Sequence, residues 1–244
     1  MTSAVSIFNG PGPAVGSPAD DSAADEAQTV LVDSSGVPHY NEFRMTQAQD
    51  IAAVVLAAGM STRMGGLKQL LPFGVDERPL IEVVVSRLKR QVDRVIVVLG
   101  HRVGDISPIL ADYGVELVVN EQYELGMVTS VQCGIRAAGD VRGYLICLGD
   151  QPGLGKQTLS LVLQRAAQMH KGIAIPVCDG RRGHPIYITN HYKAEILELP
   201  HNVGLNAVTG AHLDETEQIQ VPDESILVDV DTPQEYEQTR YRWN

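Results

Sequence analysis

Residues 51–68 read IAAVVLAAGMSTRMGGLK, and the interpretation of the whole chain starts from this stretch. Its first six residues form an unbroken apolar run, which predicts a strand covered on both faces. A loop of small residues follows, and it carries Arg63 and Lys68. Small side chains let backbone N–H groups approach phosphate oxygens, and the two cations supply counter-charge. The stretch therefore predicts a triphosphate site at the end of a buried strand.

The spacing in this loop differs from two common phosphate-binding motifs. Lys68 lies nine residues after Gly59, so GxxxxGK[ST] does not fit, and GxGxxG is absent. The alternative is a glycine-rich connection that binds nothing. A small-residue turn, an arginine and a lysine together after a buried strand favour the binding site.

Apolar runs and amphipathic stretches alternate downstream of this loop. We expect strands at 51–56, 94–99, 115–119, 143–148 and 172–177, and helices at 80–91, 103–112, 126–138 and 156–169. This order predicts an α/β fold, a three-layer sandwich with a mostly parallel Rossmann-like sheet. Ligands of such sheets bind at the carboxyl ends of the strands.

The alternation breaks after residue 177. Asp179-Gly180 predicts a hairpin turn. Further elements are expected as a helix at 190–199 with Asn190 as its cap, strands at 218–221 and 226–230, and a helix at 232–240 that starts with Thr-Pro.

The N-terminal segment differs from the rest in composition. Residues 9–25 are rich in Gly, Pro, Ala, Ser and Asp, so we expect residues 1–48 to be a disordered or variable extension. Ser34-Ser35-Gly36 favours a short hairpin at 29–43. The folded domain is expected at 49–244.

Charge and hydropathy exclude several classes of partner. The net charge of −11 argues against nucleic acid and anionic membrane surfaces. No apolar run approaches the ~20 residues of a membrane span, and no signal-peptide pattern is present. The three cysteines are far apart in apolar segments, which indicates reduced thiols. A cytoplasmic location is the expectation.

Acidic residues mark a candidate cation site. Asp150 follows the strand predicted at 143–148 and precedes Pro152, a position suited to a metal ligand. Asp229 and Asp231 alternate in a segment predicted to be extended, which would put both on one face. These carboxylates therefore predict a site for a divalent cation. The alternatives are that Asp150 caps a turn and that Asp231 caps the last helix.

A third loop, residues 120–130, reads NEQYELGMVTS between a predicted strand and a predicted helix. One interpretation places Asn120, Gly126 and Ser130 near the base and ribose of a nucleotide. The other is a simple connection in which Gly126 serves the turn.

Residues 56–74, LAAGMSTRMGGLKQLLPFG, resemble the signature LAAGxSxRMGxxKxLLPxG of the MobA-like nucleotidyltransferases. Within that family the chain looks most like the branch that uses CTP and molybdopterin, over roughly residues 50–240. The resemblance implies a nucleotide-diphospho-sugar transferase-like fold that binds an NTP with Mg²⁺. Its loop reads Ala57-Ala58-Gly59, similar to the CTP type, whereas guanylyltransferases tend to read LAGG.

The resemblance also implies roles for individual residues. The implied catalytic residues are Arg63, which meets the distal phosphates, Lys68, which reaches the α-phosphate, and Asp150. Residues 228–236 resemble the family's DIDTPEDY segment, and the resemblance implies Mg²⁺ on Asp150 and Asp231, with Asp229 as the second choice. The residues implied around the substrates are Leu56, Ala57, Ala58, Gly59, Ser61, Asn120, Gly126, Ser130 and His184. His184 belongs to the segment Arg181–Pro185, which resembles the RxGHP segment beside the acceptor; the alternative is a solvated basic turn.

The expected reaction is transfer of CMP, with GMP as the second choice, to a phosphate of molybdopterin or a similar acceptor. Pyrophosphate leaves, and a molybdoenzyme is the implied recipient of the product. Relatives carry GDxGxR where residues 201–206 read HNVGLN, so the acceptor side departs from the pattern. The alternatives are another phosphorylated acceptor, an NAD(P)H-dependent oxidoreductase of the same fold group, or a nucleotide-binding partner of a molybdoenzyme without turnover.

Overall fold

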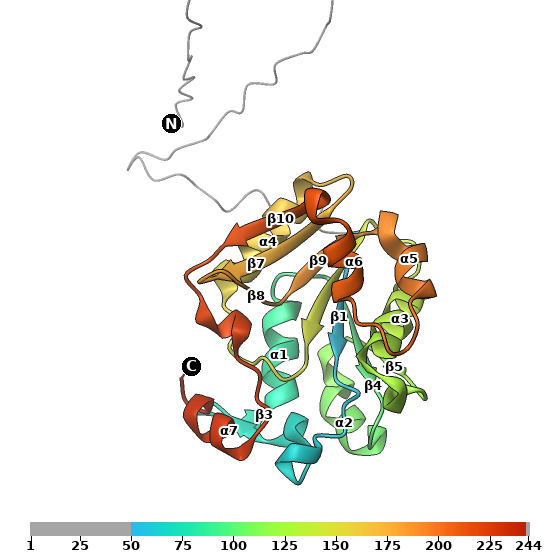
Figure 1. Ribbon diagram of the computed structural model, residues 1–244. Coiled ribbons are helices and arrows are strands. Elements are labelled where there is room, and N and C mark those ends of the chain that lie inside the picture. The colour runs from blue at the N-terminus through green and yellow to red at the C-terminus, as the bar shows by residue number, and fades with distance from the viewer. Residues whose placement is uncertain (1–49, 243–244) are drawn as a thin grey trace, which may run out of the picture. The chain divides into compact units, whose positions relative to one another are not determined.

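The apolar runs of the sequence form the central sheet of this computed structural model, which describes residues 50–242 (Figure 1). The extension predicted at 1–48, the hairpin predicted at 29–43 and the domain boundary predicted between residues 48 and 49 all lie outside the described residues. Three strands have the predicted bounds: β1 (Ile51–Leu56), β4 (Arg94–Leu99) and β6 (Gly143–Leu148). All three are almost wholly buried, because both faces of the sheet are covered.

The described residues form an eight-stranded sheet in the order β10-β7-β9-β6-β1-β4-β5, with β8 paired to β7. The remaining strands are β5 (Glu116–Val119), β7 (Ile173–Cys178), β8 (Arg181–Arg182), β9 (Ile186–Thr189) and β10 (Thr216–Gln220). Strand β9 runs antiparallel between β6 and β7, and β8 closes the predicted hairpin on β7. The other pairs are parallel, which confirms the mostly parallel α/β sheet.

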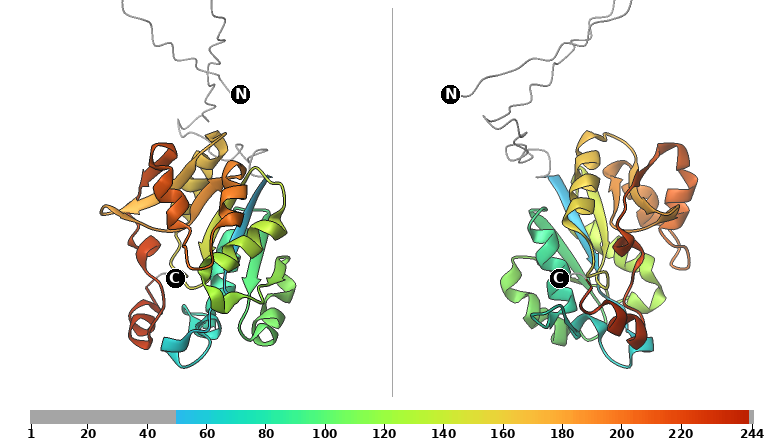
Figure 2. Two further views of the ribbon diagram at one scale, coloured as in Figure 1. Left: turned by 45° about the vertical axis from the view of Figure 1, so that its right-hand side comes forward. Right: turned by 90° about the vertical axis from the view of Figure 1, so that its left-hand side faces the viewer.

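Helices cover both faces of the sheet (Figure 2). They are α1 (Leu80–Lys89), α2 (Val103–Leu110), α3 (Met127–Ala138), α4 (Lys156–Gln168), α5 (Lys193–Glu198), α6 (Asn206–Ala211) and α7 (Pro233–Thr239). Helices α1 and α4 lie on one face, where Ser160 of α4 donates to Gln91 just after α1 (2.6 Å). Helices α3, α5 and α6 lie on the other face.

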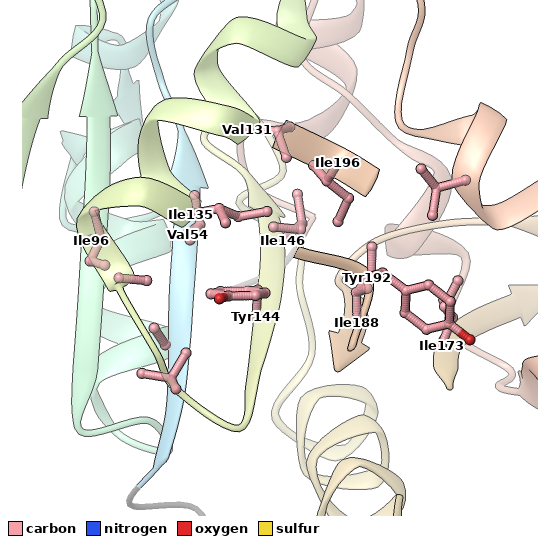
Figure 3. Close-up of a cluster of buried hydrophobic side chains, with 14 of the residues drawn as sticks. Val54, Ile96, Val131, Ile135, Tyr144, Ile146, Ile173, Ile188, Tyr192 and Ile196 are labelled. Atoms are coloured by element: carbon pink, nitrogen blue, oxygen red, sulfur yellow. The ribbon is translucent and has the colours of Figure 1, made fainter. Parts of the chain in front are cut away.

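The core on the α3 face is drawn in Figure 3. Val54 and Ile146 of the sheet face Val131 and Ile135 of α3, and Ile196 of α5 extends the same cluster. Helix α3 approaches β1 so closely that a Cβ atom at Gly134 would come within 2.2 Å of a Val54 methyl carbon. This close packing sets the position of the loop that precedes α3.

Two sequence-based expectations are wrong. Residues 226–230 do not form a strand: a 3₁₀ turn (Glu224–Leu227) is followed by extended chain outside the sheet. The cause is that backbone groups here bond to the loop after β6, since Val230 N–H donates to the Asp150 carbonyl (3.1 Å). Asn190 does not cap the following helix either, because its side-chain oxygen accepts from the Tyr144 hydroxyl (2.9 Å).

Helix α7 closes the described chain and begins with a capping box. The Thr232 hydroxyl accepts from the Glu235 N–H (3.2 Å), and the Glu235 carboxylate accepts from the Thr232 N–H (2.8 Å). Thr232, and not Asp231, is therefore the cap. Helix α7 bonds to a small hairpin, β2 (Pro72–Phe73) and β3 (Arg78–Pro79), through Tyr236 and the Pro72 carbonyl (2.5 Å).

Thr232→Ala is expected to lower the free energy of unfolding by about 1 kcal/mol, because it removes the cap oxygen. Urea denaturation followed by circular dichroism measures the change. Gln238→Ala, at an exposed position of the same helix, is the matched control and should leave stability unchanged. Equal stability of both variants with the wild type would show that the capping box contributes nothing.

None of the helices between residues 50 and 242 is long and apolar enough to cross a membrane. Cys133, Cys147 and Cys178 are all free thiols, as the sequence predicted.

Candidate active site

The loops after β1, β4 and β6 meet at the carboxyl edge of the sheet. The Leu56 carbonyl accepts from the Gly149 N–H (3.0 Å), and the Ala58 carbonyl accepts from the His101 N–H (3.2 Å). Gly100 sits at the contact, where an added Cβ would lie 2.8 Å from the Cβ atoms of both Ala58 and Tyr123. The predicted phosphate loop is thus packed directly against the ends of the neighbouring strands.

The loop between residues 59 and 68 is held open by its own polar side chains. Ser61 adopts a left-handed conformation (φ 53°), and its hydroxyl accepts from the Lys68 N–H (3.3 Å) and donates to Gln69 (3.2 Å). The buried Gln69 amide donates to the Ala57 and Gly59 carbonyls (3.2 and 3.4 Å). These bonds leave Gly59 and Gly65 exposed, so their backbone is accessible to a ligand.

Two cations and two carboxylates converge beside this loop. The Lys68 ammonium donates to both Asp150 and Asp231, at 2.7 Å in the case of Asp231. Arg63 pairs with the second oxygen of Asp231 (2.8 Å) while its side chain stays 69% exposed. Lys68 is only 12% exposed, so its ammonium is held inside the site. The structure brings together the four residues that the sequence predicted for phosphate and metal.

The charges in this cluster stabilise one another. Burial by itself would lower the pKa of Lys68, but the charge of Asp150 and the bonds to both carboxylates raise it above its ordinary value. Burial likewise works to raise the pKa of Asp231, yet Lys68 and Arg63 hold it below the ordinary range. Lys68 and Asp231 are therefore both charged at neutral pH.

Asp229 lies at the back of the cluster. Its carboxylate accepts from the Gln151 amide (2.6 Å), and Gln151 also donates to the Ile226 carbonyl (3.2 Å). Burial, with the nearby charge of Asp150, raises the pKa of Asp229. Asp229 and Asp231 lie in an extended segment outside the sheet and not in the predicted strand. Asp229 bonds to Gln151, whereas Asp231 bonds to Lys68 and Arg63.

His184 lies next to the same segment. The backbone N–H of His184 donates to the Ile226 carbonyl (3.3 Å), which also accepts from the side-chain amide of Gln151. Gly183 is required at this approach, since a Cβ there would come within 2.4 Å of the Ile226 oxygen. Burial lowers the pKa of His184 to about 4, so the imidazole is neutral at pH 7. The hairpin that carries the exposed Arg181 and Arg182 is therefore connected, through the Ile226 carbonyl and Gln151, to Asp229.

The residues predicted near the base form a bonded group. Asn120 is buried and donates to the hydroxyls of Thr129 (2.8 Å) and Ser130 (2.9 Å). Gly126 has φ 132°, and its carbonyl accepts from the Thr129 N–H at the start of α3. Asn120 and Ser130 therefore shape the loop, and direct contact of either with a base stays a prediction.

Three residues of the site escaped the sequence interpretation: Gln69, Gly100 and Gln151. Gln69 anchors the phosphate loop, and Gln151 fixes Asp229. Both glutamines are buried and lie next to a predicted site residue, Lys68 or Asp150. A polar residue among apolar neighbours in the sequence could have indicated that each has a bonding role in the site. Gly100 follows the strand β4, and its position at a strand end was the corresponding signal for a close approach.

The cluster fits a divalent metal ion in the chemistry of its donors. Two carboxylates already converge on one cation, the Lys68 ammonium, and carboxylate oxygens are the ligands that hard cations prefer. Within residues 50–242 no three His, Cys, Asp or Glu side chains are arranged to hold a metal ion. The candidate donor set is consequently the pair Asp150 and Asp231, with the remaining positions open to substrate and water.

A loop of small residues, paired cations and converging carboxylates at the carboxyl edge of a parallel sheet are typical of a nucleotide-binding α/β protein. Comparison with known families makes the class specific. The model of the MobA-like NTP transferase domain matches residues 53–216, and the chain belongs to this family of nucleotidyltransferases.

Relatives cover nearly the same length of chain. Molybdenum cofactor cytidylyltransferase of Escherichia coli (strain K12) is 24% identical over 196 residues, which are 79% of this chain and 97% of the relative. A probable molybdenum cofactor guanylyltransferase of Mycobacterium avium (strain 104) is 25% identical over 196 residues, 77% of this chain and 94% of the relative.

Among solved structures, Rv0371c from Mycobacterium tuberculosis H37Rv superposes with a TM-score of 0.67 at 24% identity, covering 78% of this chain and 97% of that one. The same protein has also been crystallised as a complex with manganese, at a TM-score of 0.63. These likenesses confirm the fold expected of a nucleotide-diphospho-sugar transferase-like protein.

Proposed function

We propose that this chain transfers the CMP group of CTP to a phosphate of a molybdopterin-type acceptor and releases pyrophosphate, with Mg²⁺ as the metal. The observation that supports it most directly is the cluster in which Arg63 and Lys68 meet Asp150 and Asp231 at the end of β1. The likeness to E. coli molybdenum cofactor cytidylyltransferase over nearly its full length supports the choice of acceptor.

The chain's own residues act mainly by position and charge. An oxygen of the acceptor phosphate forms a bond to the α-phosphorus of CTP, and the bond from that phosphorus to the β-phosphate oxygen breaks. Lys68 stabilises the negative charge on the α-phosphoryl oxygens, and Arg63 with the backbone amides of the 58–65 loop holds the departing pyrophosphate. The nucleophile is already ionised, so no general base is required. A divalent ion held by Asp150 and Asp231 would supply charge neutralisation of the phosphates.

The acceptor side offers a basic edge. Arg181 and Arg182 are exposed on β8, next to the neutral His184, and they suit an anionic acceptor in a chain of negative net charge. Residues 201–206, which lack the acid-Gly-Arg element, lie by the base loop, since the His201 oxygen is 2.7 Å from a Cβ built on Gly126. We therefore propose that the arginines of β8 supply the cationic contact to the acceptor.

Transfer of label tests the proposal directly. The protein is incubated with Mg²⁺, each of the four NTPs labelled at the α-phosphate, and molybdopterin or sugar-phosphate acceptors. We expect labelled product and pyrophosphate with CTP and molybdopterin. Equal transfer to a sugar phosphate, or NAD(P)H binding without any transfer, would contradict it and favour one of the alternative activities.

The base preference depends on the loop after β1 in a way that one substitution tests. The methyl group of Ala58 fills the space where the loops after β4 and β5 meet, next to Gly100 and Tyr123. Ala58→Gly widens this point and is expected to reduce the ratio of kcat/KM for CTP over GTP by about tenfold, since one methyl group discriminates by at least that much.

Ala57→Gly is the comparison variant. It loosens the same loop, but the Ala57 methyl packs toward Gly149 instead. The measurement is kcat/KM for both nucleotides in each variant. If the two variants shift the ratio equally, loop flexibility and not the Ala58 methyl sets the base preference.

A further inference from the structure

The Lys68 ammonium lies between the carboxylates of Asp150 and Asp231, the candidate ligands of the metal. Its nitrogen lies 2.7 Å from an oxygen of Asp231 and is bonded to Asp150 as well. The carboxylates come from distant parts of the chain, the loop after β6 and the segment before α7, yet both point at this one nitrogen. A metal ion held by Asp150 and Asp231 would need the place that the ammonium takes, since carboxylate oxygens that face one cation cannot face a second.

We propose that Lys68 and the divalent metal compete for Asp150 and Asp231, so that the metal enters only together with the nucleotide. The inference rests on the proposed function in one respect, that the metal binds this carboxylate pair. It assigns Lys68 a second role, as the internal cation that keeps the carboxylates in place and closes the site to free metal ions.

The competition follows from where the ammonium can go. Lys68 is 12% exposed, and the carboxylates are 19% and 29% exposed, so the ammonium has little access to water in the free protein. Displacing it without a new anion would leave a buried, unpaired charge, which is strongly unfavourable. The triphosphate supplies such an anion next to the loop, and the ammonium can then exchange the carboxylates for phosphate oxygens.

The same geometry makes the two ligands mutually dependent. If nucleotide moves Lys68 off the carboxylates, it raises the affinity for metal, and by linkage the metal raises the affinity for nucleotide by the same factor. Arg63 differs from Lys68 in this respect. Its guanidinium pairs with the second oxygen of Asp231 (2.8 Å), the oxygen that Lys68 does not use, and its side chain is 69% exposed, so it can move into water at little cost.

The test is a titration of the protein with Mn²⁺ in the absence of nucleotide. Electron paramagnetic resonance measures the concentration of the free ion. Lys68→Met keeps an unbranched side chain that is one atom shorter and removes the charge, and it is expected to bind Mn²⁺ at least tenfold more tightly than the wild type. Arg63→Ala removes the same charge from the cluster and is expected to tighten Mn²⁺ binding by no more than about twofold, because an exposed pair is well screened. Lys156→Met, at an exposed lysine of α4, is expected to bind like the wild type.

Two further measurements make the result decisive. In Lys68→Met/Asp150→Asn the gained affinity should disappear, and its persistence would overturn the proposal because the metal would then lie elsewhere. If Lys68→Met is poorly folded, the wild type alone still gives an answer: α,β-methylene-CTP should bind at least tenfold more tightly with Mn²⁺ than without, and Mn²⁺ alone should not raise the melting temperature.

Equal tightening in Lys68→Met and Arg63→Ala would overturn the proposal, since net charge and not occupancy would then govern metal binding. Its failure is distinguishable from failure of the proposed function. Transfer of labelled CMP by the wild type with no gain of Mn²⁺ affinity in Lys68→Met rejects the competition alone. A gain of affinity in a protein that releases no pyrophosphate from any NTP rejects the function alone.

Discussion

Lys68→Ala is expected to lower the turnover number for nucleotidyl transfer by ~10²-fold or more, the loss typical of removing one preorganised donor to a developing anion. The Lys68 ammonium is the less exposed of the two cations in the charge cluster, at 12% against 69% for Arg63, so it lies inside the site, where its charge is weakly screened by water. Because the ground-state triphosphate keeps its other contacts, the main loss is expected in kcat and less in KM. Steady-state kinetics with CTP and the acceptor measures both.

Two variants frame this result. Lys156→Ala removes an exposed lysine of α4 and should retain wild-type kinetics. Lys68→Arg keeps the charge but replaces a compact ammonium by a planar fork that cannot sit between Asp150 and Asp231 in the same way, so it should restore only part of the activity. Full activity of Lys68→Ala would remove Lys68 from the mechanism and leave Arg63 as the principal cation.

The strands at the centre of the sheet could be predicted from the sequence residue by residue. β1, β4 and β6 are apolar on both faces, and their burial leaves no other arrangement for so many consecutive aliphatic side chains. The antiparallel insertion of β9 between β6 and β7 could not be predicted, because pairing order depends on the long-range path of the chain. Residues 226–230 were predicted to be a strand because they are mostly apolar. Their backbone bonds instead to the loop that carries Asp150, a long-range contact that the sequence pattern does not reveal.

The candidate site was predictable in its charged residues and less so in its support. Arg63, Lys68, Asp150 and Asp231 each stand at a strand end or a helix start, where side chains of distant segments meet at one edge of a parallel sheet. Lys68 bonds to both carboxylates, and this contact could not be predicted from the spacing of residues because it depends on how side chains pack in three dimensions. The same holds for Asn120, whose amide is bonded to Thr129 and Ser130.

Asp150→Asn is expected to abolish the Mg²⁺-dependent part of CTP binding. The substitution keeps the size of the side chain, and the Asp150 carbonyl still accepts from the Val230 N–H (3.1 Å), so the loop should keep its path. What is lost is one of two carboxylates that face the same cation position, and a neutral amide is a much poorer ligand for Mg²⁺. Isothermal titration calorimetry with and without Mg²⁺ should show equal CTP affinities in the variant and different ones in the wild type.

The variant Asp229→Asn tests whether Asp229 is one of the two carboxylates that bind the metal. The Asp229 side chain accepts from Gln151 and has no bond to Lys68 among the described residues, so this variant is expected to keep the Mg²⁺ dependence of CTP binding. Asp76→Asn, on the exposed turn between β2 and β3, controls for the loss of one negative charge from the chain. If Asp229→Asn loses the Mg²⁺ dependence while Asp150→Asn retains it, the metal binds at the back of the cluster. Lys68 would then be free to stay on Asp150 and Asp231 throughout the reaction, which would make it a structural cation and not a ligand of the α-phosphate.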